Sequence, residues 1–466
     1  MNWEPVIGLE IHVHLKTRTK MFCRCELEYF APENSRTCPV CLAHPGTLPV
    51  PNGRAVEMTM LLGLGLGCEI AERSTFHRKH YFYPDLSKGY QISQYDEPLC
   101  VDGKMTLATA DGDLEVGIVR AHLEEDAAKN VHMGGAEGRI AGADRTLVDF
   151  NRGGTPLVEI VTAPDLHSAE HAKRFLQLLR QTVIELGISD AEMEKGSLRF
   201  DVNVSVRPEG SDELRTRTEL KNMNSFNFAA KGIEREILRQ IAIYESGGEV
   251  VQETMHFDPG NESAPPLRSK EEAQDYRYLP EPDLVPLEPP RELVERLRAE
   301  LPELPGERIR RLAAEVGFET AEGLVTTGRD RLYEQVTGDR TAVANVLMNQ
   351  FAASGVDPAE VNAAELAKLI EARDRIPRQA FTEALAASAS EDFSAERYLG
   401  DGQITESGDL EPLIDQILAA NPGQVESYRS GKEGLLGFFV GQVMKETEGR
   451  ANPKVVNELL RKKLKS

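Results

Sequence analysis

The stretch Val6-Ile7-Gly8-Leu9-Glu10-Ile11-His12-Val13-His14-Leu15 decides the fold of the N-terminal half of this chain. From Leu9 onward its residues alternate strictly between apolar and polar, and successive side chains of a β-strand point to opposite faces. The alternation therefore predicts a strand with one buried face. The other face gathers one carboxylate and two imidazoles, those of Glu10, His12 and His14.

Four further segments predict more strands, at 118–124, 156–162, 199–207 and 215–221. The first of them should place Val119, Ala121 and Leu123 on its apolar face. In 156–162, which is mostly apolar, Leu157, Glu159 and Val161 share one face. The polar positions of the four segments are Arg120, His122, Glu124, Glu159, Asp201, Asn203, Ser205, Arg207, Arg215, Arg217, Glu219 and Lys221. One half-exposed strand often alternates for packing reasons alone. Five strands with carboxylates, imidazoles and guanidinium groups indicate a ligand site instead.

The chemistry of these side chains favours a divalent cation. Carboxylates gathered on one surface raise each other's pKa unless a cation neutralises them, and carboxylate and amide oxygens are the ligands of Mg²⁺ or Ca²⁺. Mg²⁺ usually fills its shell with water and phosphate oxygens, so the site also favours a nucleotide. The sequence has no GxxxxGK[ST] loop, and we interpret the glycine run 63–67 as a helix end. Cations interleaved with aromatics at 77–90 could hold phosphate, although an ordinary packed loop has the same pattern.

Four of the six cysteines form two close pairs, Cys23-x-Cys25 and Cys38-x-x-Cys41. This spacing is typical of a structural zinc site with four thiolate ligands, which leave no open position for water. A redox dithiol is the alternative. We expect Cys68 and Cys100 to be ordinary packed residues.

Helical patterns lie within and beyond this strand-rich half. One helix should begin after Ser168 and end before Gly187, and another should span 229–246. The second should bury a stripe of Ile233, Ile237, Ile241 and Tyr244. Eight prolines between 258 and 290 predict an extended linker or wrap. An all-α half should follow, with helices including 307–316, 342–353 and 363–372.

The composition limits the class of protein. A net charge of −22 over 466 residues argues against unspecific binding to polyphosphate, so any contact with RNA must be local. The N-terminus lacks a secretory or transit pattern, and the sequence has no stretch of 18 apolar residues. We therefore expect a cytoplasmic chain of two to four domains.

Ordered motifs along the chain resemble the B subunit of the aspartyl/glutamyl-tRNA(Asn/Gln) amidotransferases, the GatB family. The N-terminal motifs are 6–12, 79–91, 122–126, 151–159 and 219–225. Near the end, 441–445, Gly449, 451–453 and 459–464 resemble the family's tail domain, which is shared with YqeY-like helical proteins. The cysteine pairs match the zinc-containing branch of the family.

The resemblance implies an α+β fold in three parts. A mainly antiparallel β cradle domain with flanking helices would cover 1–292, with a zinc knuckle at 23–41. An all-α helical domain would cover 293–400, and a small helical tail domain that binds tRNA would cover 401–466. Alternation by itself indicates only mixed α and β structure.

The resemblance also implies a function. The chain would use ATP to phosphorylate the side-chain carboxylate of mischarged Glu-tRNA(Gln) or Asp-tRNA(Asn), and ammonia would then displace the phosphate. Carried over by position, Glu10, His12, Glu124 and Glu159 would hold Mg²⁺ with the ATP phosphates. Asp201 and Asn203 would be second-line ligands. Lys79 and Lys88 would line a polar route for ammonia or stabilise developing negative charge.

Partners follow from the same resemblance. The chain shows no amidase or glutaminase motif, so ammonia would come from an amidase A subunit, which a small C subunit stabilises in a heterotrimer. Residues 435–466 carry seven Lys and Arg against three Glu. The cations expected to follow tRNA phosphates are Lys445, Arg450, Lys454, Arg461, Lys462 and Lys463. A solvated, frayed helix end is the alternative interpretation of this basic run.

Three rival hypotheses remain. The chain could be a non-catalytic zinc-containing module that delivers tRNA to another enzyme, but such a module has no use for a Glu and His cluster. A glutamyl-only archaeal relative would carry an inserted domain where this chain has only its proline-rich stretch. A mitochondrial member would carry a transit peptide.

Overall fold

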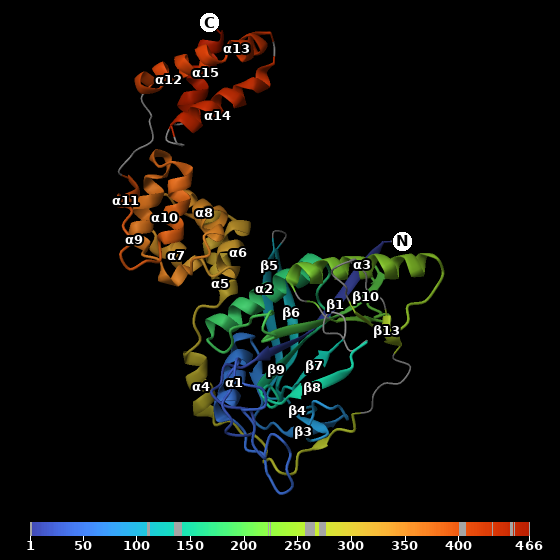
Figure 1. The fold of residues 1–466 in the computed structure, drawn as a ribbon. Helices are drawn as coiled ribbons and strands as arrows, with labels where there is room; N and C mark the ends of the chain where they lie inside the picture. Colours follow the sequence, from blue (N-terminus) through green and yellow to red (C-terminus); the bar gives the residue numbers. More distant parts are fainter. Residues whose placement is uncertain are drawn as a thin grey trace. The chain divides into compact units, whose positions relative to one another are not determined.

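The computed structural model describes residues 2–109, 112–134, 142–221, 223, 225–256, 266–269, 276–399, 407–430, 432–447, 451 and 453–465. The chain forms two compact units, Met1–Arg308 and Ile309–Ser466. The first combines β-sheet with helices, and the second is helical (Figure 1). The expected α+β class is therefore confirmed.

A nine-stranded sheet is the framework of the first unit, in the order β13-β12-β11-β10-β1-β9-β6-β5-β2. Its neighbours pair antiparallel except β11 and β12, which are parallel. The strands are β1 (Trp3–His14), β2 (Glu69–Ile70), β5 (Cys100–Thr109), β6 (Gly112–Glu125), β9 (Pro156–Thr162), β10 (Leu198–Pro208), β11 (Thr218–Lys221), β12 (Glu253–His256) and β13 (Pro266–Ser269). The opening stretch thus forms the central strand β1, between β10 and β9.

Two smaller β elements complete this unit. One is a three-stranded sheet of β14 (Leu279–Pro280), β3 (Phe76–His80) and β4 (Tyr90–Gln94), and the other pairs β7 (Lys129–Met133) with β8 (Arg145–Asp149). Strand β14 belongs to the proline-rich stretch and pairs with β3 through Leu279 and Arg78. The described part of that stretch therefore wraps back onto the first unit.

Helices cover the apolar face of the large sheet. On β1, Ile7, Ile11 and Val13 are fully buried. Helix α2 (Ala169–Glu185) packs against β5 and helix α3 (Phe226–Glu245) against β10, and both run across the sheet in Figure 1. Ser168 caps α2, with its hydroxyl accepting from the amide of His171 at 3.0 Å.

The other helices of this unit also follow the sequence. Gly187 ends the run of α2 with a φ of +65°, which a glycine adopts without strain. Helix α1 (Gly53–Gly65) ends in the glycine run, which is the helix end that we expected. Helix α4 (Arg291–Ala299) packs against α1.

Three details of the expected strands and helices are wrong. The fifth strand begins only at Thr218, so Arg215 and Arg217 lie in the preceding loop. A register shift between Ile118 and Arg120 turns Val119 out of the apolar face, and it is 47% exposed. Helix α3 buries Glu236 and Gln240 in the sheet interface, whereas the expected Ile237 and Ile241 are only half-buried.

The second unit consists of short helices. They are α5 (Pro305–Val316), which begins in the first unit, α6 (Phe318–Thr326), α7 (Asp330–Gln335), α8 (Arg340–Asn349), α9 (Ala363–Glu371), α10 (Arg378–Ala387), α11 (Glu396–Leu399), α12 (Ser407–Ala420), α13 (Pro422–Arg429), α14 (Leu436–Glu446) and α15 (Pro453–Lys465). The helices expected at 307–316, 342–353 and 363–372 are therefore present. Leu410, Phe439 and Leu460 centre a core shared by α12, α14 and α15.

The compact units divide at 308 and 309, and the division into three parts at 292 and 400 stays a prediction. Among the residues that the structure describes, no helix is both long enough and apolar enough to cross a membrane.

Candidate functional site

The strand register brings carboxylates and imidazoles into a row across the large sheet. Glu159 on β9 lies opposite His122 on β6 and opposite His12 on β1. Glu10 is the next residue of β1 on the same face as His12, and it lies opposite Asp201 on β10. Directly opposed residues on one face have Cβ atoms about 5 Å apart, so these side chains must meet.

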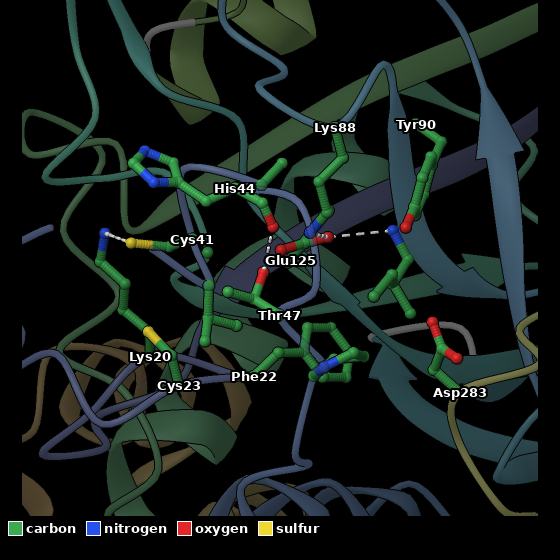
Figure 2. A pocket seen from close by; sticks show the side chains of 15 residues that line it. Lys20, Phe22, Cys23, Cys41, His44, Thr47, Lys88, Tyr90, Glu125 and Asp283 are labelled. Atoms are coloured by element: carbon green, nitrogen blue, oxygen red, sulfur yellow. Dashed lines mark hydrogen bonds and ion pairs between the residues drawn. The ribbon is translucent and has the colours of Figure 1, made fainter. Parts of the chain in front are cut away.

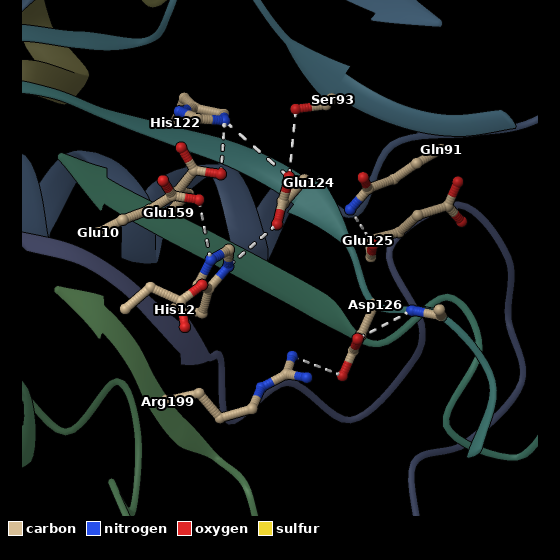
Figure 3. Close-up of polar contacts among 12 residues, drawn as sticks. Glu10, His12, Gln91, Ser93, His122, Glu124, Glu125, Asp126, Glu159 and Arg199 are labelled. Carbon is tan, nitrogen blue, oxygen red and sulfur yellow. Dashed lines mark hydrogen bonds and ion pairs between the residues drawn. The ribbon is translucent and has the colours of Figure 1, made fainter. Parts of the chain in front are cut away.

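The row lies in a cavity of about 680 Å³. Of the residues predicted to form the site, Glu10, His12, Lys79, Glu124, Glu159, Asp201 and Asn203 line this cavity, and Lys88 does not. Figure 3 shows Glu10, Glu124 and Glu159 grouped around His12.

His12 belongs to two candidate metal-ligand triads. In each triad, one possible ligand atom per residue lies within 4.8 Å of the others: Glu10, His12 and Asp201 form one set, and His12, Glu124 and Glu159 form the other. The His12 ring lies with Nε2 at 3.5 Å from Glu10 Oε1 and Nδ1 at 3.3 Å from Glu124 Oε1. Asp201, expected as a second-line ligand, therefore occupies a place equivalent to that of Glu10.

Burial strengthens the repulsion between the negative charges of neighbouring carboxylates in this cluster. Glu124 is 2% exposed and Glu159 is 5% exposed. Burial, and then the charges of Glu124 and Glu10, raise the pKa of Glu159 to about 7. Burial would lower the pKa of His12, but the facing carboxylates of Glu10 and Glu124 raise it to about 10. A cation relieves such repulsion, so this donor set fits Mg²⁺.

His122 is a functional candidate that the predicted site omitted. Its Nε2 lies 4.0 Å from Glu124 Oε2 and 3.9 Å from Glu159 Oε2. Its Nδ1 is buried and has no hydrogen-bond partner within the described parts of the chain. Burial lowers the pKa of His122 to about 3, so the ring is neutral. The alternation of β6 already placed His122 on the same face as Glu124, so the sequence alone could have predicted it as a site residue.

Cations surround the row. Burial would lower the pKa of Lys79, but the charge of Glu124 raises it, so the ammonium is retained inside the cavity. Lys221 forms ion pairs with Asp201 and with Glu219, the latter at 3.1 Å. Asp126, at the cavity margin, accepts from Arg199 Nη2 at 2.9 Å. The cavity is therefore mixed in charge, as a site for phosphate groups with a metal must be.

A second pocket of about 210 Å³ lies beside the cysteine cluster (Figure 2). Lys88 lines it and forms an ion pair with Glu125, which follows Glu124 on β6. Neighbouring positions of a strand point to opposite sides, so Glu124 lines the large cavity and Glu125 the second pocket. Lys79 and Lys88 therefore belong to different pockets.

The cysteine cluster adjoins this second pocket. Cys23 and Cys41 line the pocket, and Cys25 and Cys38 complete the cluster. The four sulfur atoms all lie within 4.8 Å of one another. The amide of Cys38 donates to Cys41 Sγ at 3.2 Å, and buried Lys20 brings Nζ to 3.7 Å from the same sulfur. Four converging sulfurs with nearby N–H donors fit a tetrahedral metal site.

Two family models match this chain. The model of the GatB/GatE catalytic domain matches residues 5–295, and the model of the GatB domain matches 331–464. The chain belongs to the GatB family. The first match contains the whole carboxylate cavity and the cysteine cluster.

Curated relatives extend over the full chain. The B subunit of the aspartyl/glutamyl-tRNA(Asn/Gln) amidotransferase of Geobacter sulfurreducens is 47% identical, with 100% of each chain covered. The B subunits of the same enzyme from Carboxydothermus hydrogenoformans, with 99% of each chain covered, and Persephonella marina, with 100% covered, are 45% and 42% identical. The GatB resemblance drawn from the motifs is therefore confirmed.

A groove of about 310 Å³ continues from the GatB cavity along the sheet and shares four lining residues with it, Glu10, Arg120, Asn203 and Arg217. Gly8 and Val6 form part of its floor, and Arg215 and Arg217 reach it from the loop before β11. Arg215 is held in place by the rings of Trp3 and Tyr244, with its guanidinium carbon 5.2 and 4.6 Å from their centroids. The arginines that we assigned to a strand thus line a groove.

The basic residues predicted to contact tRNA have different surroundings. Lys445, Arg461 and Lys462 are exposed. Lys463 Nζ donates to Asp415 at 2.7 Å, so its charge is partly neutralised. Arg450 lies outside the described residues, as does the side chain of Lys454.

Proposed function

We propose that this chain is the carboxylate-activating and tRNA-binding subunit of an amidotransferase that converts Glu-tRNA(Gln) to Gln-tRNA(Gln) and Asp-tRNA(Asn) to Asn-tRNA(Asn). The observation that carries the proposal is the row of carboxylates and imidazoles around His12, which includes both ligand triads. The names of the relatives supply the reaction class.

Two steps make up the reaction. An oxygen of the side-chain carboxylate attacks the γ-phosphorus of ATP, ADP leaves, and an acyl phosphate forms. The nitrogen of ammonia then attacks the acyl carbon, phosphate leaves, and the nitrogen loses a proton to give the amide. A free carboxylate is unreactive toward ammonia at neutral pH, and phosphate is the leaving group that makes the second step possible.

The triads would hold Mg²⁺, which supplies charge neutralisation for the ATP phosphates. Glu10, His12, Glu124 and Glu159 are the proposed ligands, with Asp201 and Asn203 beside them. The adjoining groove would take the rest of the nucleotide, since it begins beside the triads at Glu10 and offers the backbone and side-chain surface of Val6 and Gly8 to the face of the base.

The two lysines would act in different places. Lys79 remains charged inside the large cavity, where it can stabilise the negative charge that develops on the transferred phosphoryl group. Lys88 and Glu125 line the second pocket and form an ion pair there, so their polar groups could line the path of ammonia toward the acyl phosphate.

Other subunits complete the proposed enzyme. An amidase A subunit would release ammonia from an amide donor, and a small C subunit would stabilise the assembly. Zn²⁺ at the four cysteines would be structural, because four thiolates fill its coordination sphere. The basic residues of the tail would bind tRNA phosphates.

The experiment that tests the proposal uses the assembled amidotransferase with ammonium as nitrogen donor, so that ammonia delivery does not limit the rate. We expect ATP-dependent formation of Gln-tRNA(Gln) by the parent and a loss of at least about 100-fold with Glu124→Gln. Glu115→Gln, a change of an exposed carboxylate on the same strand, is the matched control. Equal rates for parent and Glu124→Gln would favour the rival, a non-catalytic tRNA-binding module.

A further inference from the structure

Four tyrosines form a continuous row at the edge of the carboxylate cavity. Tyr81, Tyr276, Tyr278 and Tyr95 all line the cavity. Successive ring centroids lie 6.0, 6.2 and 4.2 Å apart. Tyr81 directly follows β3, Tyr95 directly follows β4, and Tyr276 and Tyr278 come from the proline-rich stretch, so the tyrosine row joins segments that are far apart in the sequence.

The inner end of the tyrosine row adjoins the reacting groups. Lys79 Nζ lies 5.0 Å from the centroid of the Tyr276 ring. The same lysine interacts electrostatically with Glu124 and Glu159. A substrate carboxylate near Lys79 would therefore lie next to Tyr276, the second ring of the row.

The outer end of the row is open to solvent. Tyr95 and Tyr278 stack with an interplanar angle of 10°. His77 meets Tyr95 edge-on, with centroids 6.2 Å apart, and its Nε2 lies 3.1 Å from Asp96 Oδ1. Tyr95 nevertheless remains 55% exposed. A large aromatic side chain is thus held in a fixed orientation but left uncovered.

We infer that Tyr95, supported by Tyr278, is the stacking platform for the terminal base of the substrate tRNA. This inference rests on the proposed function. The substrate's amino acid is esterified to the terminal ribose, so the terminal base is joined to the reacting carboxylate through one ribose and one amino acid. Single-stranded RNA ends are bound mainly by stacking on aromatic side chains. The tyrosine row supplies such a ring two spacings from Tyr276.

The inference is tested with Tyr95→Ala in the assembled amidotransferase, with ammonium as nitrogen donor. Stacking of one base is worth about tenfold or more in affinity, so we expect the KM for Glu-tRNA(Gln) to rise by about that factor. The KM for ATP should not change. Tyr95→Trp should restore the parent KM, and Phe30→Ala, which removes an exposed ring outside the cavity, should have no effect.

A substrate whose terminal nucleotide lacks its base identifies the contact. With this substrate, we expect the KM of the parent for the tRNA to rise by the same factor as the KM of Tyr95→Ala rises with the normal substrate. The KM of Tyr95→Ala should not rise further when the base is removed. The inference would be overturned if the two changes raised the KM for the tRNA independently, so that their factors multiplied. An unchanged KM for the tRNA in Tyr95→Ala, or a raised KM for ATP, would also overturn it. A parent that forms no Gln-tRNA(Gln) at all would instead overturn the proposed function, and the inference with it.

Discussion

At the scale of single residues, the site depends on His12 more than on any of its neighbours. The imidazole belongs to both ligand triads, whereas each carboxylate belongs to one. It also lies between Glu10 and Glu124, at 3.5 and 3.3 Å. Loss of this ring should therefore affect every cation bound in the cavity.

We predict that His12→Ala weakens divalent-cation binding by about 100-fold, because it removes the ligand that both triads share. Asp201→Asn should have a smaller effect, since it changes only one triad. Paramagnetic Mn²⁺ titration of the purified chain measures both. His132→Ala, at an imidazole on β7 outside the cavity, is the control. Tight Mn²⁺ binding by His12→Ala would contradict the assignment.

The sequence predicted which residues form the site better than it predicted how they are divided between the large cavity and the second pocket. Period-two alternation placed Glu10, His12 and Glu124 on polar faces, because that depends only on local geometry. It could not show that Lys79 and Lys88 line different pockets. That division depends on which side of β6 each of two neighbouring carboxylates faces in the folded sheet.

At the scale of the elements, α3 shows how an apolar stripe can mislead. Glu236 is 2% exposed and accepts from Thr218 Oγ1 and Gln240 Nε2, both at 2.8 Å. Arg239 also donates to it. Buried polar groups that satisfy one another can replace apolar contacts, and a helix pattern alone does not reveal partners on a strand.

We predict that Glu236→Ala lowers the free energy of unfolding of the first unit by about 2–3 kcal/mol, because it leaves buried donors without an acceptor. The network lies on the helix side of the sheet, so amidation by the folded fraction should be unchanged. Thermal denaturation is the measurement. Glu234→Ala, at an exposed glutamate of the same helix, should be nearly neutral, and equal melting temperatures for both variants would contradict the network's role.

The cysteine cluster has a separate prediction. The chain should bind one Zn²⁺, and a Cys38→Ser, Cys41→Ser double variant should bind none. Without the metal, the segment between the cysteine pairs loses its main constraint, so trypsin should cleave after Arg36 much faster than in the parent. Metal analysis and timed proteolysis check this. Cys68→Ala, at a buried cysteine outside the cluster, should retain the zinc. Undiminished zinc in the double variant would contradict the ligand assignment.

At the scale of the whole molecule, the sequence predicted the change from β-rich to helical structure from composition and periodicity. The strand order of the large sheet could not be predicted, since it brings β1 beside β10 through pairing between segments far apart in the chain. The proline-rich stretch was predicted as extended, yet its tyrosines belong to the cavity rim. Such long-range placement leaves no local pattern.

The molecule's charge is strongly negative, so its affinity for tRNA should depend on a few local cations. We predict that the triple change Lys445→Ala, Arg461→Ala, Lys462→Ala reduces the slope of log affinity against log salt concentration by about two. Lys463→Ala should have less effect, because Asp415 already pairs with it. Filter binding of tRNA at several salt concentrations measures the slopes, and equal slopes for parent and triple variant would exclude this surface.

The central claim is that this chain activates the side-chain carboxylate by phosphoryl transfer from ATP. The most direct test follows ¹⁸O from the labelled side-chain carboxylate of Glu-tRNA(Gln) during amidation with ammonium. The account predicts one ¹⁸O atom in the released inorganic phosphate for each Gln-tRNA(Gln) formed. Unlabelled phosphate alongside normal product formation would show that no acyl phosphate is made, and would contradict it.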